Sequence, residues 1–193
     1  MTTATSRLTQ RDYYTVAMKL LAEGSHESLT IAALCDELGV SKGSFYHHFG
    51  GWSGFVAGLL ESWERESTLE LKEAAEKIDA VGTKYRLLSN LIDTIPHDAE
   101  AALRVWSHTD PTVKEAVSRV DAIRESMVTD FFALTIAKSD AAQLAELYLS
   151  TLVGNQFAHR PVDTRRMRKL LNQMTKLTEA FYGPEVFGGA AKT

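Results

Sequence analysis

The ten residues from Val40 to Phe49, VSKGSFYHHF, combine a lysine, two serines and a tyrosine with two adjacent histidines. Three kinds of chemistry fit such a set. The aromatic rings can form a buried core, the histidines can bind a metal ion, or the polar side chains can contact another molecule from an exposed surface. The sequence argues against a metal site, because neighbouring residues of a helix diverge by about 100° and no third ligand lies nearby.

Two short helices joined by a turn are predicted to position this stretch. Thr30 is a favourable N-cap for the first helix, and Gly39 is placed to end it in a Schellman stop. Ser41 caps the second helix, in which Phe45 and Phe49 lie four residues apart and face the same way. The segment therefore has the dimensions of a helix-turn-helix, with the two phenylalanines turned inward and the polar residues facing out.

Helical periodicity continues through the rest of the 193 residues, and no convincing β alternation is present. The first helix is expected to end at Gly24 in a left-handed conformation, and the Gly-rich C-terminal tail is expected to be frayed. The fold class expected is therefore all-α. After the helix-turn-helix, further helices are predicted over about 55–78, 82–95, 98–108, 111–136, 139–157 and 163–182.

Composition narrows the classes of function. Hydrophobic residues make up 45% of the chain and charged residues 24%, which is typical of a soluble globular protein. No apolar window is long enough to cross a membrane and the N-terminus lacks a signal-peptide core, so a cytoplasmic protein without a membrane partner is expected. The single cysteine, Cys35, excludes an internal disulfide. Without paired catalytic carboxylates, a nucleophile triad or clustered metal ligands, we expect no enzyme, no metal and no cofactor.

Net charge by itself does not favour nucleic-acid binding. The chain carries a net charge of −4. Within residues 1–50, four basic side chains (Arg7, Arg11, Lys19, Lys42) stand against five acidic ones (Asp12, Glu23, Glu27, Asp36, Glu37). If this part of the chain binds DNA, the placement of a few groups must account for it, because bulk charge does not.

Residues 30–49, TIAALCDELGVSKGSFYHHF, resemble the DNA-binding motif of the tetracycline-repressor (TetR) family of bacterial transcription regulators. The similarity covers about residues 7–67 and is most specific from Gly39 to Phe49. The resemblance implies a three-helix DNA-binding domain at residues 1–50 and a helical bundle for ligand binding and dimerisation at residues 51–193. It also implies a homodimeric repressor that leaves a palindromic DNA operator when a small-molecule effector binds.

The resemblance also implies which residues contact DNA. The eight positions are Thr30, Ser41, Lys42, Gly43, Ser44, Tyr46, His47 and His48. Gly43 lets the start of the helix approach the groove, while Ser44 can reach a base edge and Lys42 a guanine or a phosphate. Tyr46 and His48 are expected at phosphates and His47 at a base or sugar. Thr30 is expected near a phosphate, since helix N-termini bind anions.

One departure from the family pattern lies at the foot of the fourth helix. Family members usually carry a lysine there that binds a phosphate. This chain instead reads GGWSGF, with Trp52 near that place. Either backbone amides at the helix start bind the phosphate, or the contact with DNA is weaker.

The predicted bundle offers candidates for a ligand cavity and for a dimer interface. The cavity candidates, each of which could instead be ordinary core or surface, are Trp63, Tyr85, His97, Arg104, Trp106 and His108. The last two helices carry apolar faces beside small residues, and these faces are expected to pair with their two-fold mates. The interface candidates, which could instead face inward within one chain, are Leu144, Leu147, Tyr148, Leu152, Met167, Leu170, Leu171, Met174 and Phe181.

Two alternatives stay open. The cluster RRMRK at residues 165–169 suggests either a nucleic-acid contact or a solvated helix face. For the whole protein, the rival is a helical-bundle enzyme or small-molecule carrier that has lost DNA binding. The slightly acidic N-terminal part and the missing lysine favour this rival.

Overall fold

The computed structural model describes residues 8–189, so residues 1–7 of the expected DNA-binding domain and the last four residues of the tail lie outside it. All regular structure within residues 8–189 is helical, as the apolar spacing predicts. In chain order the elements are α1 (Gln10–Glu23), the 3₁₀ turn η1 (His26–Ser28), α2 (Ile31–Leu38), α3 (Lys42–Phe49), α4 (Trp52–Glu64), the π-helical segment η2 (Arg65–Leu69), α5 (Glu70–Glu76), α6 (Val81–Leu91), α7 (His97–Trp106), α8 (Pro111–Phe132), α9 (Lys138–Ala158), α10 (Thr164–Tyr182) and the 3₁₀ turn η3 (Pro184–Phe187).

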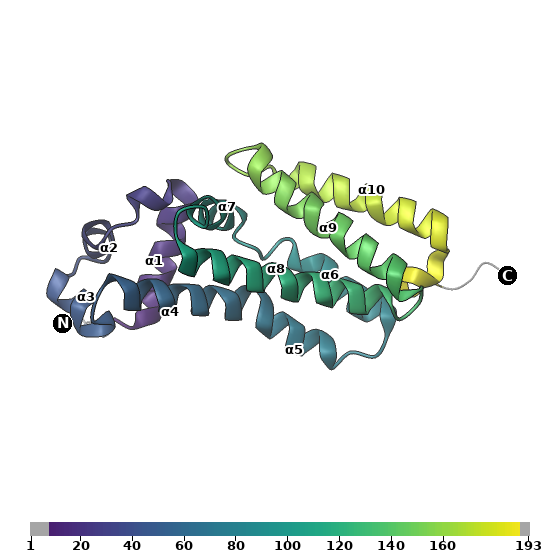
Figure 1. Ribbon diagram of the computed structural model, residues 1–193, viewed down its shortest axis with the longest axis horizontal. Coiled ribbons are helices and arrows are strands. Elements are labelled where there is room, and N and C mark those ends of the chain that lie inside the picture. The colour runs from purple at the N-terminus through teal and green to yellow at the C-terminus, as the bar shows by residue number, and fades with distance from the viewer. Residues whose placement is uncertain (1–7, 190–193) are drawn as a thin grey trace, which may run out of the picture.

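Helices α1, α2 and α3 form a head at one end of an elongated molecule (Figure 1). Tyr13, Leu34 and Phe45, one from each helix, are fully buried and hold the head together. Gly24 ends α1, but its φ of −132° is an ordinary value, so the predicted left-handed stop is wrong at this position. The chain does not reverse there in a Schellman turn but continues directly into η1.

Helix α4 links the head to the bundle. The helical segments α4, η2 and α5 follow one another without a break, close to the single helix that the sequence predicts. In the π-helical segment in the middle, backbone hydrogen bonds span five residues instead of four, so the turn is wider than in an α-helix. Ser67 and Thr68 within it are both buried, so this short stretch turns polar groups towards the interior of the bundle.

One apolar core runs from the head into the bundle. Tyr13 of α1, Phe55 of α4, Leu103 of α7 and Val113 of α8 all belong to it and are fully buried. Each such side chain contributes about 1.5–3 kcal/mol by leaving water. The division of the chain after residue 50 stays a prediction, because residues on both sides of it share this core.

Helices α8, α9 and α10 and the C-terminal turn build the far end of the bundle. Val186 in η3 is 1% exposed, and the ring centroid of Phe187 lies 4.6 Å from that of Tyr85 in α6. The expectation of a frayed tail is therefore wrong for residues 184–187, because their apolar side chains cover the end of α6.

No helix within residues 8–189 is long and apolar enough to cross a membrane. In the same part of the chain, His, Cys, Asp and Glu side chains do not gather into a group of three or more that could hold a metal ion.

Candidate DNA-binding surface and ligand cavity

Caps at the helix ends fix the turn between α2 and α3. The Thr30 hydroxyl accepts a hydrogen bond from the Ala33 amide at 3.1 Å, and the Ser41 hydroxyl accepts one from the Ser44 amide at 3.3 Å. Gly39 takes a left-handed conformation with a φ of 66°, and the following amide bonds back to α2 as a Schellman stop requires. These local contacts set how α3 is presented at the end of the molecule.

Helix α3 has a buried face and an exposed face. Phe45 is 0% exposed, and its ring packs against Tyr13 and Phe55 with centroids 6.1 and 5.3 Å away. Five of the predicted DNA-contacting residues are exposed on or just before the helix, namely Ser41, Lys42, Gly43, Tyr46 and His47. The head therefore presents a polar helix face at the end of the molecule opposite η3 (Figure 1).

Ser44 and His48 lie at the edge between these two faces, where Tyr13 of α1 contacts both. The hydroxyl oxygens of Ser44 and Tyr13 are 2.9 Å apart, and the His48 ring centroid lies 5.4 Å from that of Tyr13. The backbone carbonyl of His48 also accepts a hydrogen bond from the Gln10 side chain at 2.8 Å. Helix α1 thus supports α3 from behind, and the Ser44 oxygen keeps a second lone pair for another partner.

Little free positive charge remains on the head. Lys19 forms an ion pair with Glu37, and this hydrogen bond raises the pKa of Lys19. Arg11 lies 3.5 Å from Glu66. Lys42 is the one side chain with a permanent positive charge among the eight predicted contact residues. The N-termini of α2 and α3 add partial positive charge beside it.

The foot of α4, where the family lysine is missing, is apolar. Trp52 is half-buried, and its ring lies 5.3 Å from Phe55 and 6.5 Å from Trp106. Two residues later, a Cβ atom on Gly54 would meet the Phe49 carbonyl oxygen at 2.3 Å. The end of α3 therefore lies so close to α4 that only glycine fits, while Trp52 anchors the head to the bundle.

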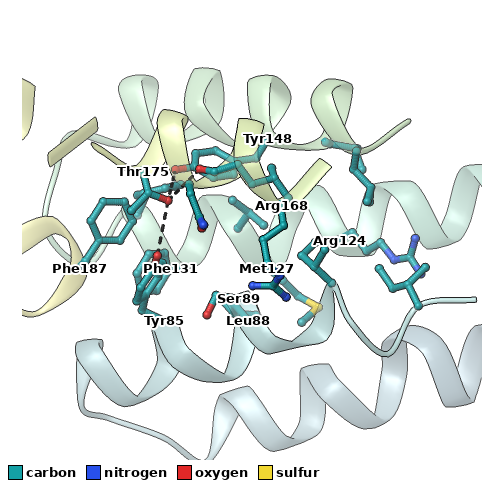
Figure 2. A pocket seen from close by; sticks show the side chains of 18 residues that line it. Tyr85, Leu88, Ser89, Arg124, Met127, Phe131, Tyr148, Arg168, Thr175 and Phe187 are labelled. Carbon is teal, nitrogen blue, oxygen red and sulfur yellow. Dashed lines mark hydrogen bonds between the residues drawn. The ribbon is translucent and has the colours of Figure 1, made fainter. Parts of the chain in front are cut away.

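A cavity of about 130 Å³ lies inside the bundle between α6, α8, α9 and α10 (Figure 2). Its walls are mainly aliphatic and aromatic side chains, among them Leu88, Met127, Phe131, Leu152 and Phe187. Its shape and lining are those of a small-molecule site, which is typically concave and apolar with few polar groups.

The polar side chains in the cavity wall are three hydroxyl residues that bond to one another, two arginines, Ser89 and Asn172. Tyr85 donates a hydrogen bond to the Thr175 hydroxyl at 3.5 Å, and the Tyr148 hydroxyl lies 3.3 Å from the same oxygen (Figure 2). Burial raises the pKa of Tyr148, so this hydroxyl stays protonated at neutral pH. Elsewhere in the wall, Arg124 and Arg168 bring the two positive charges that line the cavity.

Glu100 and Arg124 lie at the centre of a buried polar network. Two guanidinium nitrogens of Arg124 donate to the two oxygens of Glu100 at 3.0 and 2.6 Å. Trp63 and Gln156 also donate to this carboxylate, at 3.1 and 2.9 Å. Burial alone would raise the pKa of Glu100, but Arg124, Gln156 and Arg104 together hold that pKa below its ordinary value. The fully buried carboxylate is therefore ionised.

Arg124 also contacts the π-helical segment. Its Nε donates to the Thr68 hydroxyl at 3.2 Å, and a terminal nitrogen lies 3.5 Å from the Ser67 carbonyl oxygen. Arg124 thus touches the cavity, Glu100 and the helix that leads to the head. Buried networks of this kind are sensitive to the loss of any one member.

A second hollow of about 320 Å³ lies where α1 meets α4. Trp63 lines it, together with Arg11 and Glu66, which form an ion pair between two of its walls. Both of these charged side chains are largely exposed. The hollow is therefore an open junction between head and bundle, with Tyr14, Met18 and Leu59 also in its wall.

Comparison with known proteins identifies the head. Residues 14–56 match the model of a family described as bacterial regulatory proteins, tetR family, from α1 through the capped turn and α3 into α4. The head of the chain is that of a TetR-family regulator. No curated protein sequence matches the chain.

Solved structures share the fold of this chain. A transcriptional regulator from Rhodococcus sp. Rha1 has a TM-score of 0.73 at 16% identity, over 91% of this chain and 98% of its own. A TetR-family transcriptional regulator from Agrobacterium tumefaciens has a TM-score of 0.71 at 19% identity, over 87% and 96%. A transcriptional regulator from Saccharomonospora viridis in complex with choline has a TM-score of 0.66 at 16% identity, over 86% and 95%. At such identities the similarity shows the fold alone.

Most of the predicted ligand residues lie outside the bundle cavity. Tyr85 lines the bundle cavity as predicted. Trp63 and Arg104 belong to the buried network beside it, Trp106 packs on aromatic rings next to the head, and His108 is exposed. None of these four lines the bundle cavity, because α4 and α7 face the core that continues into the head, and their part in ligand binding stays a prediction.

Arg168 was missed as a cavity residue. It belongs to the RRMRK cluster, whose other basic residues Arg165, Arg166 and Lys169 are exposed, as a solvated helix face requires. Arg168 instead turns towards the cavity and forms an ion pair with Asp93. Its spacing of three and seven residues from Leu171 and Thr175, which line the same cavity, was the available signal.

The predicted dimer residues divide between core and surface. Leu152 and Met167 are buried, and Leu144, Tyr148 and Leu171 pack against clusters inside the protomer. The inward faces of α9 and α10 thus cover this chain's own core, and a part for these five residues in a dimer interface stays a prediction. Met174 is half-buried, and the large apolar side chains that are exposed on the two helices are Leu147, Phe157, Leu170, Leu177 and Phe181.

Proposed function

We propose that this regulator is a homodimeric repressor that binds a palindromic operator and leaves it when a small molecule occupies the bundle cavity. The exposed face of α3, held by caps within the segment that matches the tetR family, is the observation that carries the proposal. In the proposed repressor, residues 1–50 bind DNA and residues 51–193 bind the ligand and the second subunit. Such a protein works on DNA in the cytoplasm and is not an enzyme.

The proposed DNA contacts follow from the two faces of α3. Lys42, Tyr46 and His47 extend from the exposed face and contact bases and phosphates, while Gly43 leaves room for the groove. At the edge of this face, Ser44 reaches a base edge and His48 a phosphate. Thr30 and Ser41 direct the N-termini of α2 and α3 at the phosphate backbone. Because Lys42 is the main charged contact, binding depends on helix N-termini and hydrogen bonds more than on bulk charge.

The proposed ligand response passes through Arg124. A ligand in the cavity displaces the apolar side chains that pack around this arginine and so shifts its contacts with Glu100 and Thr68. Because Thr68 belongs to the helical run that begins at the head, the shift changes how α4 holds α3. A coupling of about 1–3 kcal/mol would change operator affinity about 5–150-fold.

The proposed dimer pairs α9 and α10 with their two-fold mates. The five exposed apolar side chains on these helices would leave water if a second copy packed against them. Two heads related by this axis would bind half-sites about 34–36 Å apart, or a multiple of that distance.

Selection from random-sequence double-stranded DNA, followed by a gel-shift assay, tests the proposal. We expect enrichment of a palindrome whose half-sites are spaced for two heads. A helical enzyme or carrier without DNA binding would enrich no sequence.

A further inference from the structure

The size of the cavity limits its ligand to a small molecule. An apolar protein cavity of about 150 Å³ binds benzene. The cavity between α6, α8, α9 and α10 has a similar volume, about 130 Å³. It therefore holds a single ring or a short chain without a large opening of the bundle.

The charge of the walls limits the ligand further. Arg124 and Arg168 line the cavity, and among the described residues that line it none is an aspartate or glutamate. A cation would lose its water here without gaining a carboxylate partner. An anion would gain charge-assisted hydrogen bonds, which are about twice as strong as neutral ones.

Of the two arginines, Arg168 is the one that can take a new partner. The guanidinium of Arg124 is engaged by Glu100, whose side chain is fully buried. Arg168 is paired with Asp93, whose side chain is 64% exposed. Since exposed ion pairs contribute about 0–1 kcal/mol, exchanging Asp93 for a ligand carboxylate costs little. Figure 2 shows the Arg168 side chain extending from α10 across the cavity towards Met127.

At the end of the cavity away from Arg168, the wall does not require a charged group on the ligand. The hydroxyls of Tyr85, Tyr148 and Thr175 already form hydrogen bonds with one another. Aromatic and aliphatic side chains, among them Phe131 and Leu88, surround them. An apolar ring fits between these side chains while its charged group points at Arg168.

We infer that the cavity selects a small apolar molecule with a single anionic group, such as an aromatic carboxylate, and discriminates against organic cations of the same size. The inference names the ligand class of the proposed ligand response and rests on that proposal.

Isothermal titration calorimetry of the full-length protein without DNA tests it at pH 7 with three probes of matched size: benzoate, benzyl alcohol and benzylamine, which is protonated at this pH. We expect benzoate to bind tightest, benzyl alcohol more weakly and benzylamine not measurably. Benzylamine or benzyl alcohol binding as tightly as benzoate would overturn the inference, and so would the absence of binding by all three.

Arg168→Gln should weaken benzoate binding about 10- to 100-fold, the value of a hydrogen bond to a charged group. It should leave benzyl alcohol binding unchanged, which shows that the cavity is intact. Arg166→Gln, an exposed neighbour on α10, is the matched control and should change neither. Unaltered benzoate binding by Arg168→Gln would overturn the inference. Because the titrations contain no DNA, their outcome is independent of the operator selection.

Discussion

Lys42 and Tyr46 extend from the exposed face of α3, and Tyr46 is 52% exposed. Lys42→Ala and Tyr46→Phe should therefore weaken DNA binding with little effect on folding, since surface substitutions usually change stability by about 0.5 kcal/mol or less. If Lys42 binds a phosphate, its removal should reduce the salt dependence of binding by about one ion. Fluorescence anisotropy with the selected operator, at several salt concentrations, measures both quantities.

The matched control for Lys42→Ala is Lys114→Ala, which removes an exposed lysine from α8 in the bundle. It should leave DNA affinity and its salt dependence unchanged. A large fall in the melting temperature of Lys42→Ala or Tyr46→Phe would instead mean that the substituted side chain packs in the core and does not face DNA.

Glu100 is a fully buried carboxylate that balances buried arginines, so Glu100→Gln should destabilise the fold by about 3–5 kcal/mol. The folded protein holds the pKa of Glu100 below its ordinary value of 4.5. Its contribution to stability is therefore present above about pH 4.5 and is lost as the pH falls through the lower folded-state pKa. Urea unfolding from pH 7 to pH 3 should show a shallower acid loss in the variant. An identical slope in both proteins would exclude Glu100 from acid unfolding.

At the junction of α3 and α4, replacing a helical glycine by alanine is expected to destabilise the protein, although the same change stabilises most helices. Gly→Ala within a helix usually stabilises it by up to about 1 kcal/mol. At Gly54 the added methyl would meet the Phe49 carbonyl at 2.3 Å, so Gly54→Ala should instead cost about 1–3 kcal/mol and displace α3. Thermal unfolding and DNA binding should both be impaired.

Gly43→Ala gives the contrasting result within α3 itself. A Cβ there meets only the Ser41 hydroxyl, at an ordinary 3.5 Å, so the fold should be unharmed. DNA affinity should nevertheless fall, because the methyl group would occupy the space that the groove needs. A normal affinity for Gly43→Ala would show that this end of α3 does not approach DNA.

Arg160, in the connection between α9 and α10, caps the C-terminus of α1 by donating to the carbonyl oxygens of Leu21, at 2.9 Å, and Gly24. Cations at helix C-termini are stabilising, so Arg160→Gln should cost about 1–2 kcal/mol and speed hydrogen exchange in the last turn of α1. Arg165→Gln, which changes an exposed arginine on α10, should leave that exchange unchanged. Equal exchange in both variants would mean that Arg160 does not hold the head.

At the scale of the whole molecule, the exposed side chains of α10 decide assembly. Leu177 and Phe181 are 60% and 79% exposed, whereas Leu171 faces the cavity. Leu177→Glu with Phe181→Glu should therefore give a folded monomer of about 21.4 kDa, or an unfolded chain if the dimer is obligate, with loss of operator binding. Light scattering of the unmodified protein at micromolar concentration is the first measurement. A monomer there would exclude the dimer and the spacing of two heads that depends on it.

The capped turn and the two faces of α3 could be predicted from the sequence by itself. Thr30 and Ser41 cap their helices through atoms three residues away, and Phe45 faces inward through helical spacing of three and four residues. These features depend on neighbours along the chain. Helix positions along the bundle follow from the same short-range periodicity, with ends that differ by a few residues.

Only the tertiary structure decided where the cavity lies and which apolar faces are covered. Tyr85 and Thr175 meet across the cavity although 90 residues separate them, and Arg124 reaches Thr68 across 56 residues. The apolar residues of α10, Met167 and Leu177 among them, lie on a single stripe of the helix, so periodicity alone could not separate the part of the stripe in the core from the part on the surface. The physical reason is that burial depends on which helices pack together, and that packing is a property of the whole chain.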